Sequence, residues 1–212
     1  MSDTVTLYGF DGSTYVRTVR IMLAKKGIAY AQVPVNVLAG ETRSAEHLAR
    51  HPFGKVPVLD IDGMRLRETD AICRYLDARS PSPAMIPADA KQAAKMAEVI
   101  GMINSYGYSA MVGGVAAYHL FPDFVGGKNE QMRADGLTAS KTLLALIMQI
   151  KGDAPYIAGD APSIADYLLG PILFYVALTP DAGEVMAIPG LADWWDRISS
   201  DAEFAASVPD LG

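Results

Sequence analysis

A cluster of prolines and serines at residues 80–89, SPSPAMIPAD, divides the chain into two segments with different patterns. Before the cluster, short apolar runs typical of strands alternate with helical patterns. After it, helical patterns continue without a convincing strand. Clusters of this composition mark domain boundaries. We therefore expect an α/β domain at residues 1–80, a linker at 81–89 and an all-helical domain at 90–212.

The N-terminal segment follows the order strand, helix, strand, then hairpin and helix. TVTLY at residues 4–8 and AQVPVNV at 31–37 are predicted strands with a helix between them. A short helical crossover of this kind favours a parallel pair of strands. Residues 55–68 predict a hairpin that turns at Asp62-Gly63, and residues 69–79 predict a helix. The outline is βαβ-ββα.

The C-terminal segment carries helical patterns separated by turn-rich stretches. These patterns cover residues 90–120, 128–151, 163–178 and 190–200. The third begins with Ser163 and Asp166, whose spacing matches a capping box with aspartate in place of the usual glutamate. We expect these two residues to have a structural role.

Composition excludes several classes of function. The net charge of −6 and the pI of about 5.0 argue against nucleic acid as a general partner, because phosphate binding needs a basic face. Cys73 is the only cysteine, which excludes an internal disulfide, a CxxC redox pair and a cysteine metal cluster. We find no signal-peptide pattern, and the most apolar later segment, residues 110–121, is too short for a membrane span. We expect a cytoplasmic protein with no bound metal and no membrane or nucleic-acid partner.

The Val56-Pro57 pair stands at the start of a predicted strand and has two interpretations. Proline has no N–H for a strand ladder, so this strand could lie at the edge of the sheet. Alternatively, a cis peptide bond could turn the backbone of Val56 outward and leave its N–H and C=O free for an extended ligand. These residues alone leave both interpretations open.

Residues 51–77, HPFGKVPVLDIDGMRLRETDAICRYLD, resemble the glutathione-binding half of a cytosolic glutathione S-transferase. The family pattern contains an Asn-Pro-Phe-Gly-like stretch, a Val-Pro pair, an Asp-Gly hairpin and a Glu-Ser helix start. His51 replaces the usual asparagine here, and Thr69 replaces the serine. Residues 40–54 are most similar to the serine-type phi and theta-like classes and their bacterial relatives, and PSIADYLLGP at 162–171 is similar to the family's box in the second domain.

The resemblance implies a thioredoxin-like domain that binds glutathione as co-substrate, a helical domain, and a homodimer. Glu68 would bind the γ-glutamyl ammonium group. Thr69, with the amides at its helix start, would bind the γ-glutamyl carboxylate. The backbone of Val56, next to a cis Pro57, would pair with the cysteinyl part. The residues implied to meet the glycine carboxylate or nearby backbone are Thr42, Arg43 and Lys55.

Ser13 is the residue that the resemblance implies for activating the glutathione thiol. The phi-type pattern Ser-Thr-Asn-Val aligns with residues 13–16, at a predicted helix start. A free thiol with a pKa of about 8.5 is mostly protonated at pH 7, and a hydroxyl donating to sulfur at a helix N-terminus stabilises the thiolate. Ser13 is equally suited to be a helix N-cap. Tyr8 is the rival, because other transferase classes use a tyrosine at the end of the first strand.

A hydrophobic electrophile would bind beside the glutathione sulfur. The residues that the resemblance implies for this site are Phe10, Tyr106, Met111 and Tyr118. Periodicity does not show which of them face a cleft, and an apolar stripe is ordinarily core. The sequence therefore predicts a glutathione S-transferase acting on a hydrophobic electrophile. A non-catalytic ligand-binding protein of the same fold and a glutathione-dependent peroxidase or isomerase remain as alternatives.

Overall fold

The computed structural model describes residues 4–210, which form two compact units. The first unit comprises the chain up to Ala84 together with the segment that begins at Ala202, and the second unit comprises Met85–Asp201. The division near Ala84 falls inside the cluster of prolines and serines. The sequence analysis placed the segment after Ala202 in the helical domain, whereas here it packs with the first unit.

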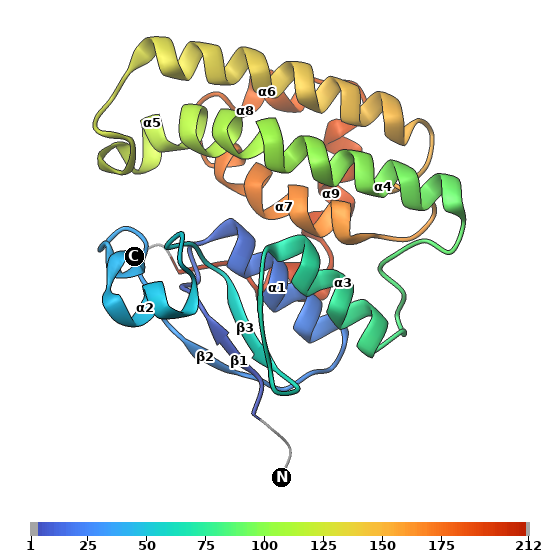
Figure 1. Cartoon of the computed structure of the whole chain (residues 1–212). Coiled ribbons are helices and arrows are strands. Elements are labelled where there is room, and N and C mark those ends of the chain that lie inside the picture. The colour runs from blue at the N-terminus through green and yellow to red at the C-terminus, as the bar shows by residue number, and fades with distance from the viewer. Residues whose placement is uncertain (1–3, 211–212) are drawn as a thin grey trace. The chain divides into compact units, whose positions relative to one another are not determined.

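A four-stranded mixed sheet forms the centre of the first unit (Figure 1). Its strands are β1 (Thr6–Tyr8), β2 (Ala31–Val33), β3 (Val58–Ile61) and β4 (Met64–Arg67). Their order is β2-β1-β3-β4, with β1 and β2 parallel and the other neighbours antiparallel. The predicted βαβ-ββα order and the parallel first pair are confirmed.

The helices α1 (Thr14–Lys25) and α3 (Thr69–Arg79) pack against each other beside the sheet (Figure 1). Leu7 and Leu59 are opposite each other on β1 and β3 and are fully buried. Because side chains alternate between the two faces of a strand, this pair marks the core face of the sheet. On α3, Ile72 and Leu76 are also fully buried, as expected for a helix with one apolar stripe.

The second strand is shorter than predicted. The apolar pattern suggested a strand over residues 31–37, but β2 ends at Val33. Pro34 follows directly, and proline has no N–H to continue the ladder. The hairpin, in contrast, is formed as predicted, since Asp62 and Gly63 have φ values of 51° and 74° in the turn between β3 and β4.

The second unit is helical. Its long first helix starts with α4 (Ala90–Met102), continues through the π-helical segments η2 (Ile103–Gly107) and η3 (Ser109–Ala116), and ends with α5 (Ala117–Leu120). The other long helices are α6 (Glu130–Lys151), α7 (Ile164–Ala177) and α9 (Leu191–Ser199). All four predicted helical stretches are therefore confirmed. Within residues 4–210, no helix combines the length and hydrophobicity that a membrane span requires.

Several short helices were not predicted. They are η1 (Glu41–Arg43), η4 (Pro122–Val125), α8 (Ala182–Met186) and α10 (Ala202–Ala206). Between η1 and β3 the chain also forms the short helix α2 (Ala45–Arg50). Segments of three to five residues are too short to show a helical period, so their apolar residues give no pattern to detect.

The capping box at the start of α7 is confirmed. The Asp166 carboxylate accepts hydrogen bonds from the Ser163 N–H at 2.8 Å, the Ile157 N–H at 3.0 Å and the Trp194 indole N–H at 2.8 Å. Burial raises the pKa of Asp166, while these donors favour its ionised form. The residue joins α7 to α9 and to the preceding loop, so its role is structural.

The first helical stretch and α6 approach each other closely at two glycines, and α4 and α6 are seen side by side in Figure 1. A Cβ atom added to Gly114 would lie 2.8 Å from the Gly136 Cα, and one added to Gly136 would lie 2.8 Å from the Gly114 Cα. Glycine is therefore required at both positions by contact between backbones. The neighbouring Gly113 faces open space instead.

We expect Gly114→Ala to destabilise the protein by about 1–3 kcal/mol, because the added methyl group overpacks the helix crossing. Gly113→Ala is the matched control. It should be neutral or stabilising by up to about 1 kcal/mol, since alanine is the better helix former and meets no neighbouring atom. Urea unfolding monitored by circular dichroism measures both changes. Equal effects at the two positions would show that the crossing does not depend on Gly114.

Candidate functional site

Three segments that carry the predicted site residues meet at one end of the sheet. In the strand register, Tyr8 of β1 is opposite Val58 of β3, and Val58 is opposite Arg67 of β4. The chain leaves β1 towards Ser13, enters β3 from Pro57 and leaves β4 towards Glu68. Antiparallel pairing therefore brings the start of α1, the Val56-Pro57 pair and the start of α3 to the same end of the sheet. We call this end the shared edge.

Ser13 is the N-cap of α1, with φ −78° and ψ 124°. Its Oγ accepts a hydrogen bond from the Val16 N–H at 3.4 Å, and its own N–H donates to the Phe10 carbonyl at 3.1 Å. The residue is half-buried, and none of the hydrogen bonds described within residues 4–210 uses the Ser13 hydroxyl as a donor. The predicted capping role is confirmed, and the hydroxyl hydrogen is left for another acceptor.

Tyr8 has a different environment. Its hydroxyl donates to the Asp60 carboxylate at 3.2 Å, and the guanidinium groups of Arg50 and Arg65 lie 4.4 Å and 5.8 Å from its ring centroid. Asp60 is opposite Thr6 in the register, so the Tyr8 hydroxyl is directed back along β1. This direction leads away from the sheet end at which α1 and α3 begin.

The Val56-Pro57 peptide bond is cis. The strand that follows it, β3, lies between β1 and β4, so the edge-strand interpretation is wrong. Pro57 precedes the first ladder residue, Val58, and its missing N–H therefore costs no strand hydrogen bond. Among the hydrogen bonds described for residues 4–210, none uses the N–H or C=O of Val56. These two groups are available to an extended ligand.

Glu68 adopts a strained backbone conformation just before α3, with φ 65° and ψ 118°. Positive φ is uncommon for residues other than glycine and costs on the order of 1–3 kcal/mol. Its side chain is 80% exposed and makes no capping hydrogen bond to the helix. The next residue, Thr69, is buried at the first position of α3. An exposed carboxylate thus stands beside a helix N-terminus.

Thr42, Arg43 and Lys55 are held near this edge by the loop after α2. A Cβ atom added to Gly54 would lie 2.8 Å from the Thr42 carbonyl oxygen and 3.4 Å from the Arg43 side chain. Gly54 has φ 59°, so both its conformation and this contact require glycine. Thr42 is buried, while Arg43 and Lys55 are exposed. The packing therefore leaves two cations facing solvent near the candidate site.

The four residues predicted for a hydrophobic substrate lie in different surroundings. Phe10, half-buried, packs over Gly12 in the loop before Ser13. Tyr106 is 64% exposed. Met111 is fully buried and lies near Gly107, whereas Tyr118 is half-exposed, lies beside Arg133 and forms a hydrogen bond with Glu130 that raises its pKa. Within the second unit, Tyr106, Met111 and Tyr118 do not gather into one apolar pocket.

Tyr106 instead lines a groove of about 590 Å³ in the second unit, between the first helical stretch and the N-terminal half of α6. The lining residues are small or polar apart from Tyr106 and Met132, and they include Ser105, Ser109, Asp135 and the close pair Gly114 and Gly136. The small residues at the helix crossing leave the surface hollow at this position. The groove contains none of the residues implied for glutathione.

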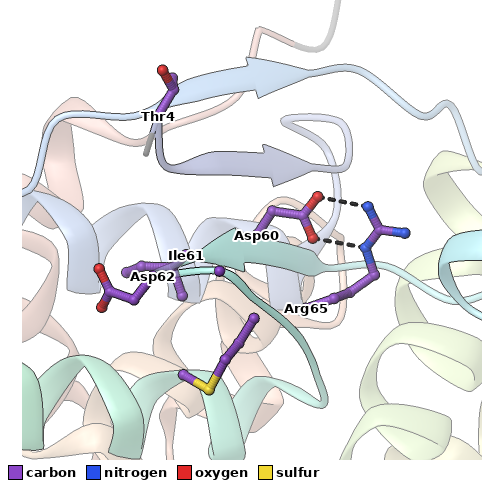
Figure 2. Close-up of a pocket in the computed structure, with 7 residues that line it drawn as sticks. Thr4, Asp60, Ile61, Asp62 and Arg65 are labelled. Atoms are coloured by element: carbon purple, nitrogen blue, oxygen red, sulfur yellow. Dashed lines mark hydrogen bonds and ion pairs between the residues drawn. The ribbon is translucent and has the colours of Figure 1, made fainter. Parts of the chain in front are cut away.

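A second cavity, of about 310 Å³, lies at the β3–β4 hairpin (Figure 2). Figure 2 shows Asp60 facing Arg65, whose guanidinium donates two hydrogen bonds of 2.6 and 2.7 Å to the carboxylate. These bonds hold the pKa of Asp60 below its ordinary value. Asp62, also in the lining, accepts from Tyr75 and Arg79. The cavity lies at the opposite end of β3 from Val56 and its acids are already paired, so it is not the candidate site.

The C-terminal segment is anchored by Arg17, a contact that sequence patterns do not predict. Arg17, on the second turn of α1, is 1% exposed and donates to the Ser207 hydroxyl at 2.9 Å and to the Phe204 carbonyl at 3.1 Å. Its guanidinium also lies 4.2 Å from the centroid of the Phe204 ring. The apolar Phe204, followed by two alanines, was the available signal for α10, but its partner is 187 residues away and had no local signature.

Cys73 is fully buried within α3, and burial raises the pKa of its thiol. A thiol in this state is not a nucleophile and packs as a small apolar residue. In the part of the chain that the structure describes, no three His, Cys, Asp or Glu side chains gather as a metal site would require.

Comparisons with known proteins agree with this architecture. The family model for the glutathione S-transferase N-terminal domain matches residues 3–78, and that for the C-terminal domain matches residues 108–202. The chain is 33% identical to maleylacetoacetate isomerase of Pseudomonas aeruginosa, over 96% of this chain and 92% of that protein. It is 29% identical to glutathione S-transferase 4 of Zea mays, over 92% of this chain and 88% of that protein.

A solved structure of maize glutathione S-transferase I in complex with an atrazine–glutathione conjugate superposes with a TM-score of 0.82. It is 27% identical to this chain, and the match covers 97% of this chain and 98% of the maize protein. The family models match both halves of the chain, and the solved structure matches almost its whole length. The chain belongs to the glutathione S-transferase family.

Proposed function

We propose that this protein is a glutathione S-transferase in which the Ser13 hydroxyl donates to the thiolate of glutathione. The thiolate attacks an electrophilic carbon of a hydrophobic substrate, forming a carbon–sulfur bond as the leaving group departs or the electrons move into an acceptor. Ser13 is not consumed, because it stabilises the anion and does not attack. The maize relative solved with an atrazine–glutathione conjugate supports a product of this chemical class.

The observation that carries the proposal is the strand register. It brings the start of α1, the Val56-Pro57 pair and the start of α3 to one end of the sheet. Glutathione is extended and has a thiol between two charged ends. Ser13 at the start of α1 would meet the thiol, and the unused backbone groups of Val56 would pair with the cysteinyl residue. Glu68 and the helix start at Thr69 would receive the γ-glutamyl ammonium and carboxylate groups.

The glycine end of glutathione would lie towards Thr42, Arg43 and Lys55. Arg43 and Lys55 are exposed cations close to the loop that carries Val56, so either could pair with the glycine carboxylate. For contacts with the electrophile we propose Phe10, next to Ser13, in the first unit, and separately Tyr106 and Tyr118 in the second unit. Met111 is fully buried, so it would not contact a substrate directly.

Ser13 is favoured over Tyr8 because the two hydroxyl groups differ in their hydrogen bonds. The Tyr8 hydroxyl is used by Asp60 and is directed away from the shared edge, whereas the Ser13 hydroxyl hydrogen is unused at a helix N-terminus. The helix dipole and the donated hydrogen bond both favour a thiolate at this position. Each unit by which they lower the thiol pKa corresponds to about 1.4 kcal/mol.

Ser13→Ala should lower kcat/KM for a chloronitrobenzene electrophile by roughly 10- to 100-fold, the effect of losing one hydrogen bond to a charged group. The variant should still be retained on immobilised glutathione. Ser13→Thr keeps the hydroxyl and should retain more activity, and Tyr8→Phe should change kcat/KM by less than about threefold, within the range of surface changes. Unchanged turnover in Ser13→Ala would exclude Ser13. Glutathione binding with no turnover of any electrophile or peroxide would instead indicate a non-catalytic binding protein.

A second candidate is a glutathione-dependent cis–trans isomerase. It is favoured by the 33% identity to the Pseudomonas aeruginosa relative, whose name describes isomerisation of maleylacetoacetate. In such a reaction the thiolate adds to a conjugated double bond, rotation follows, and elimination regenerates glutathione. The same Ser13 hydroxyl would serve this chemistry, because both reactions begin with the thiolate.

If the protein is an isomerase, maleylacetoacetate should be converted with catalytic amounts of glutathione and without accumulation of a conjugate. Absorbance of the substrate, with titration of free thiol, distinguishes this outcome from transfer, which consumes one glutathione per turnover. Ser13→Ala should slow the isomerisation by a factor similar to its effect on transfer. No conversion of maleylacetoacetate, together with steady consumption of glutathione by other electrophiles, would reject this candidate.

Glu68 should show opposite effects on stability and binding. Glu68→Gly relieves the positive φ and should raise the free energy of unfolding by about 1 kcal/mol. Glu68→Gln keeps the strain and should leave stability within about 0.5 kcal/mol of the parent. Both variants should bind glutathione at least about tenfold more weakly, since each loses the carboxylate partner of the ammonium group. Urea unfolding and calorimetry measure the two effects, and full binding by Glu68→Gln would contradict the assigned role.

We also propose a homodimer, in which the first unit of one chain contacts the second unit of its partner. Phe53, in the loop after α2, is 74% exposed in the single chain, so its ring offers apolar surface to a partner. A partner subunit covering this ring would remove its apolar surface from water.

A further inference from the structure

His51 is buried directly beneath the exposed carboxylate of Glu68. It is the C-cap of α2 and 2% exposed, and its Nε2 atom lies 4.0 Å from the Glu68 Oε1 atom. Its Nδ1 atom is buried as well and has no hydrogen-bond partner among the described residues. An imidazole with an unpaired buried nitrogen thus lies next to the group proposed to bind the ammonium group of glutathione.

Three ionisable groups surround the His51 ring. Glu68 favours its protonated form, while Arg67 from β4 and His47 from α2 disfavour it. Arg67 is held in place by a hydrogen bond of 2.6 Å from its Nε atom to the Arg50 carbonyl, and His47 by one of 2.8 Å between its Nε2 atom and the Lys55 carbonyl. The Phe53 ring packs edge-on at 6.1 Å between centroids.

Burial is the largest influence and lowers the pKa of His51 below the ordinary value for histidine. The ring is therefore neutral at neutral pH, and it gains a proton at a lower pH than an ordinary histidine does. Its charge at a given pH depends on Glu68, and a ligand cation on Glu68 would act on it in turn. The two sites are close enough for this coupling to be direct.

We propose that His51 controls the affinity of Glu68 for the ammonium group of glutathione, with protonation of the His51 ring weakening glutathione binding. This inference rests on the proposed function, because it assigns the Glu68 carboxylate to the γ-glutamyl ammonium group. When His51 is neutral, Glu68 presents an uncompensated negative charge to the ligand. When His51 is protonated, the pair of residues is neutral overall, and the ligand ammonium meets a second cation nearby.

The sign follows from linkage. Bound ammonium disfavours a charged His51, so the complex holds its proton less tightly than the free protein does. Affinity must then fall as the pH falls through the pKa of His51 in the free protein. Asparagine, the usual residue of the family pattern at this position, cannot titrate, so the coupling is a property of the histidine in this chain.

Calorimetric titration with S-methylglutathione between pH 7.5 and pH 5 tests the proposal, because this probe lacks the free thiol that would titrate in the same range. We expect the affinity to weaken by roughly threefold once the His51 ring is protonated, as estimated for two unit charges about 6 Å apart in water. The affinity of His51→Asn should change by less than about twofold over the same pH range, which is comparable to the effect of a surface substitution. His119→Gln, which removes a histidine of the second unit, should behave like the parent.

The possible results distinguish a failure of the His51 coupling from a failure of the proposed function. If the affinity of His51→Asn depends on pH as strongly as that of the parent protein, this inference is overturned and the proposed function still stands. No binding of S-methylglutathione at any pH would overturn both. A readout without ligand is provided by NMR titration of the histidine rings: the pKa of His51 should fall in Glu68→Gln, because the carboxylate that raises it is gone. An unchanged pKa would also overturn the coupling.

Discussion

The pairing of β3 with both of its neighbours is the constraint on which the rest of the first unit depends. Leu7 and Leu59 are opposite each other and fully buried, so a shift of the register by one residue would move one of them to the other face of the sheet. The burial of these side chains therefore determines that Tyr8, Val58 and Arg67 are aligned. The alignment in turn determines which loop residues meet at the end of the sheet.

The end of the sheet where these loops meet combines strained and unpaired groups that are unusual for a stable surface. Glu68 has a strained backbone and an exposed carboxylate, Val56 has backbone groups without partners, and His51 has an unpaired buried nitrogen. Each feature costs free energy in the isolated chain. The other acids of the hairpin, Asp60 and Asp62, are paired with arginines instead. This contrast is why the Val56 end of β3, and not the hairpin end, is the candidate site.

Much of the fold could be predicted because its signals are local. The helix over 69–79, the turn at Asp62-Gly63 and the long helices of the second unit each carry their own pattern of apolar residues or turn formers. The errors have local causes too: Pro34 shortened the second strand, and helices as short as α8 show no period. Part of the candidate site was also local, since Ser13 is recognisable as a cap from its own position at a helix start.

The sequence by itself determined the order of elements, the division into two segments, the cap at Ser13 and the family pattern around Val56-Pro57 and Glu68-Thr69. These features depend on residues within a few positions of one another, so composition and spacing are enough to identify them. Only the tertiary structure decided that Tyr8 is engaged by Asp60, 52 residues away, that β3 is an interior strand, and that His51 is buried beneath Glu68. Hydrogen bonds, burial and strain of this kind arise from contacts between distant parts of the chain. Spacing along the sequence does not encode them.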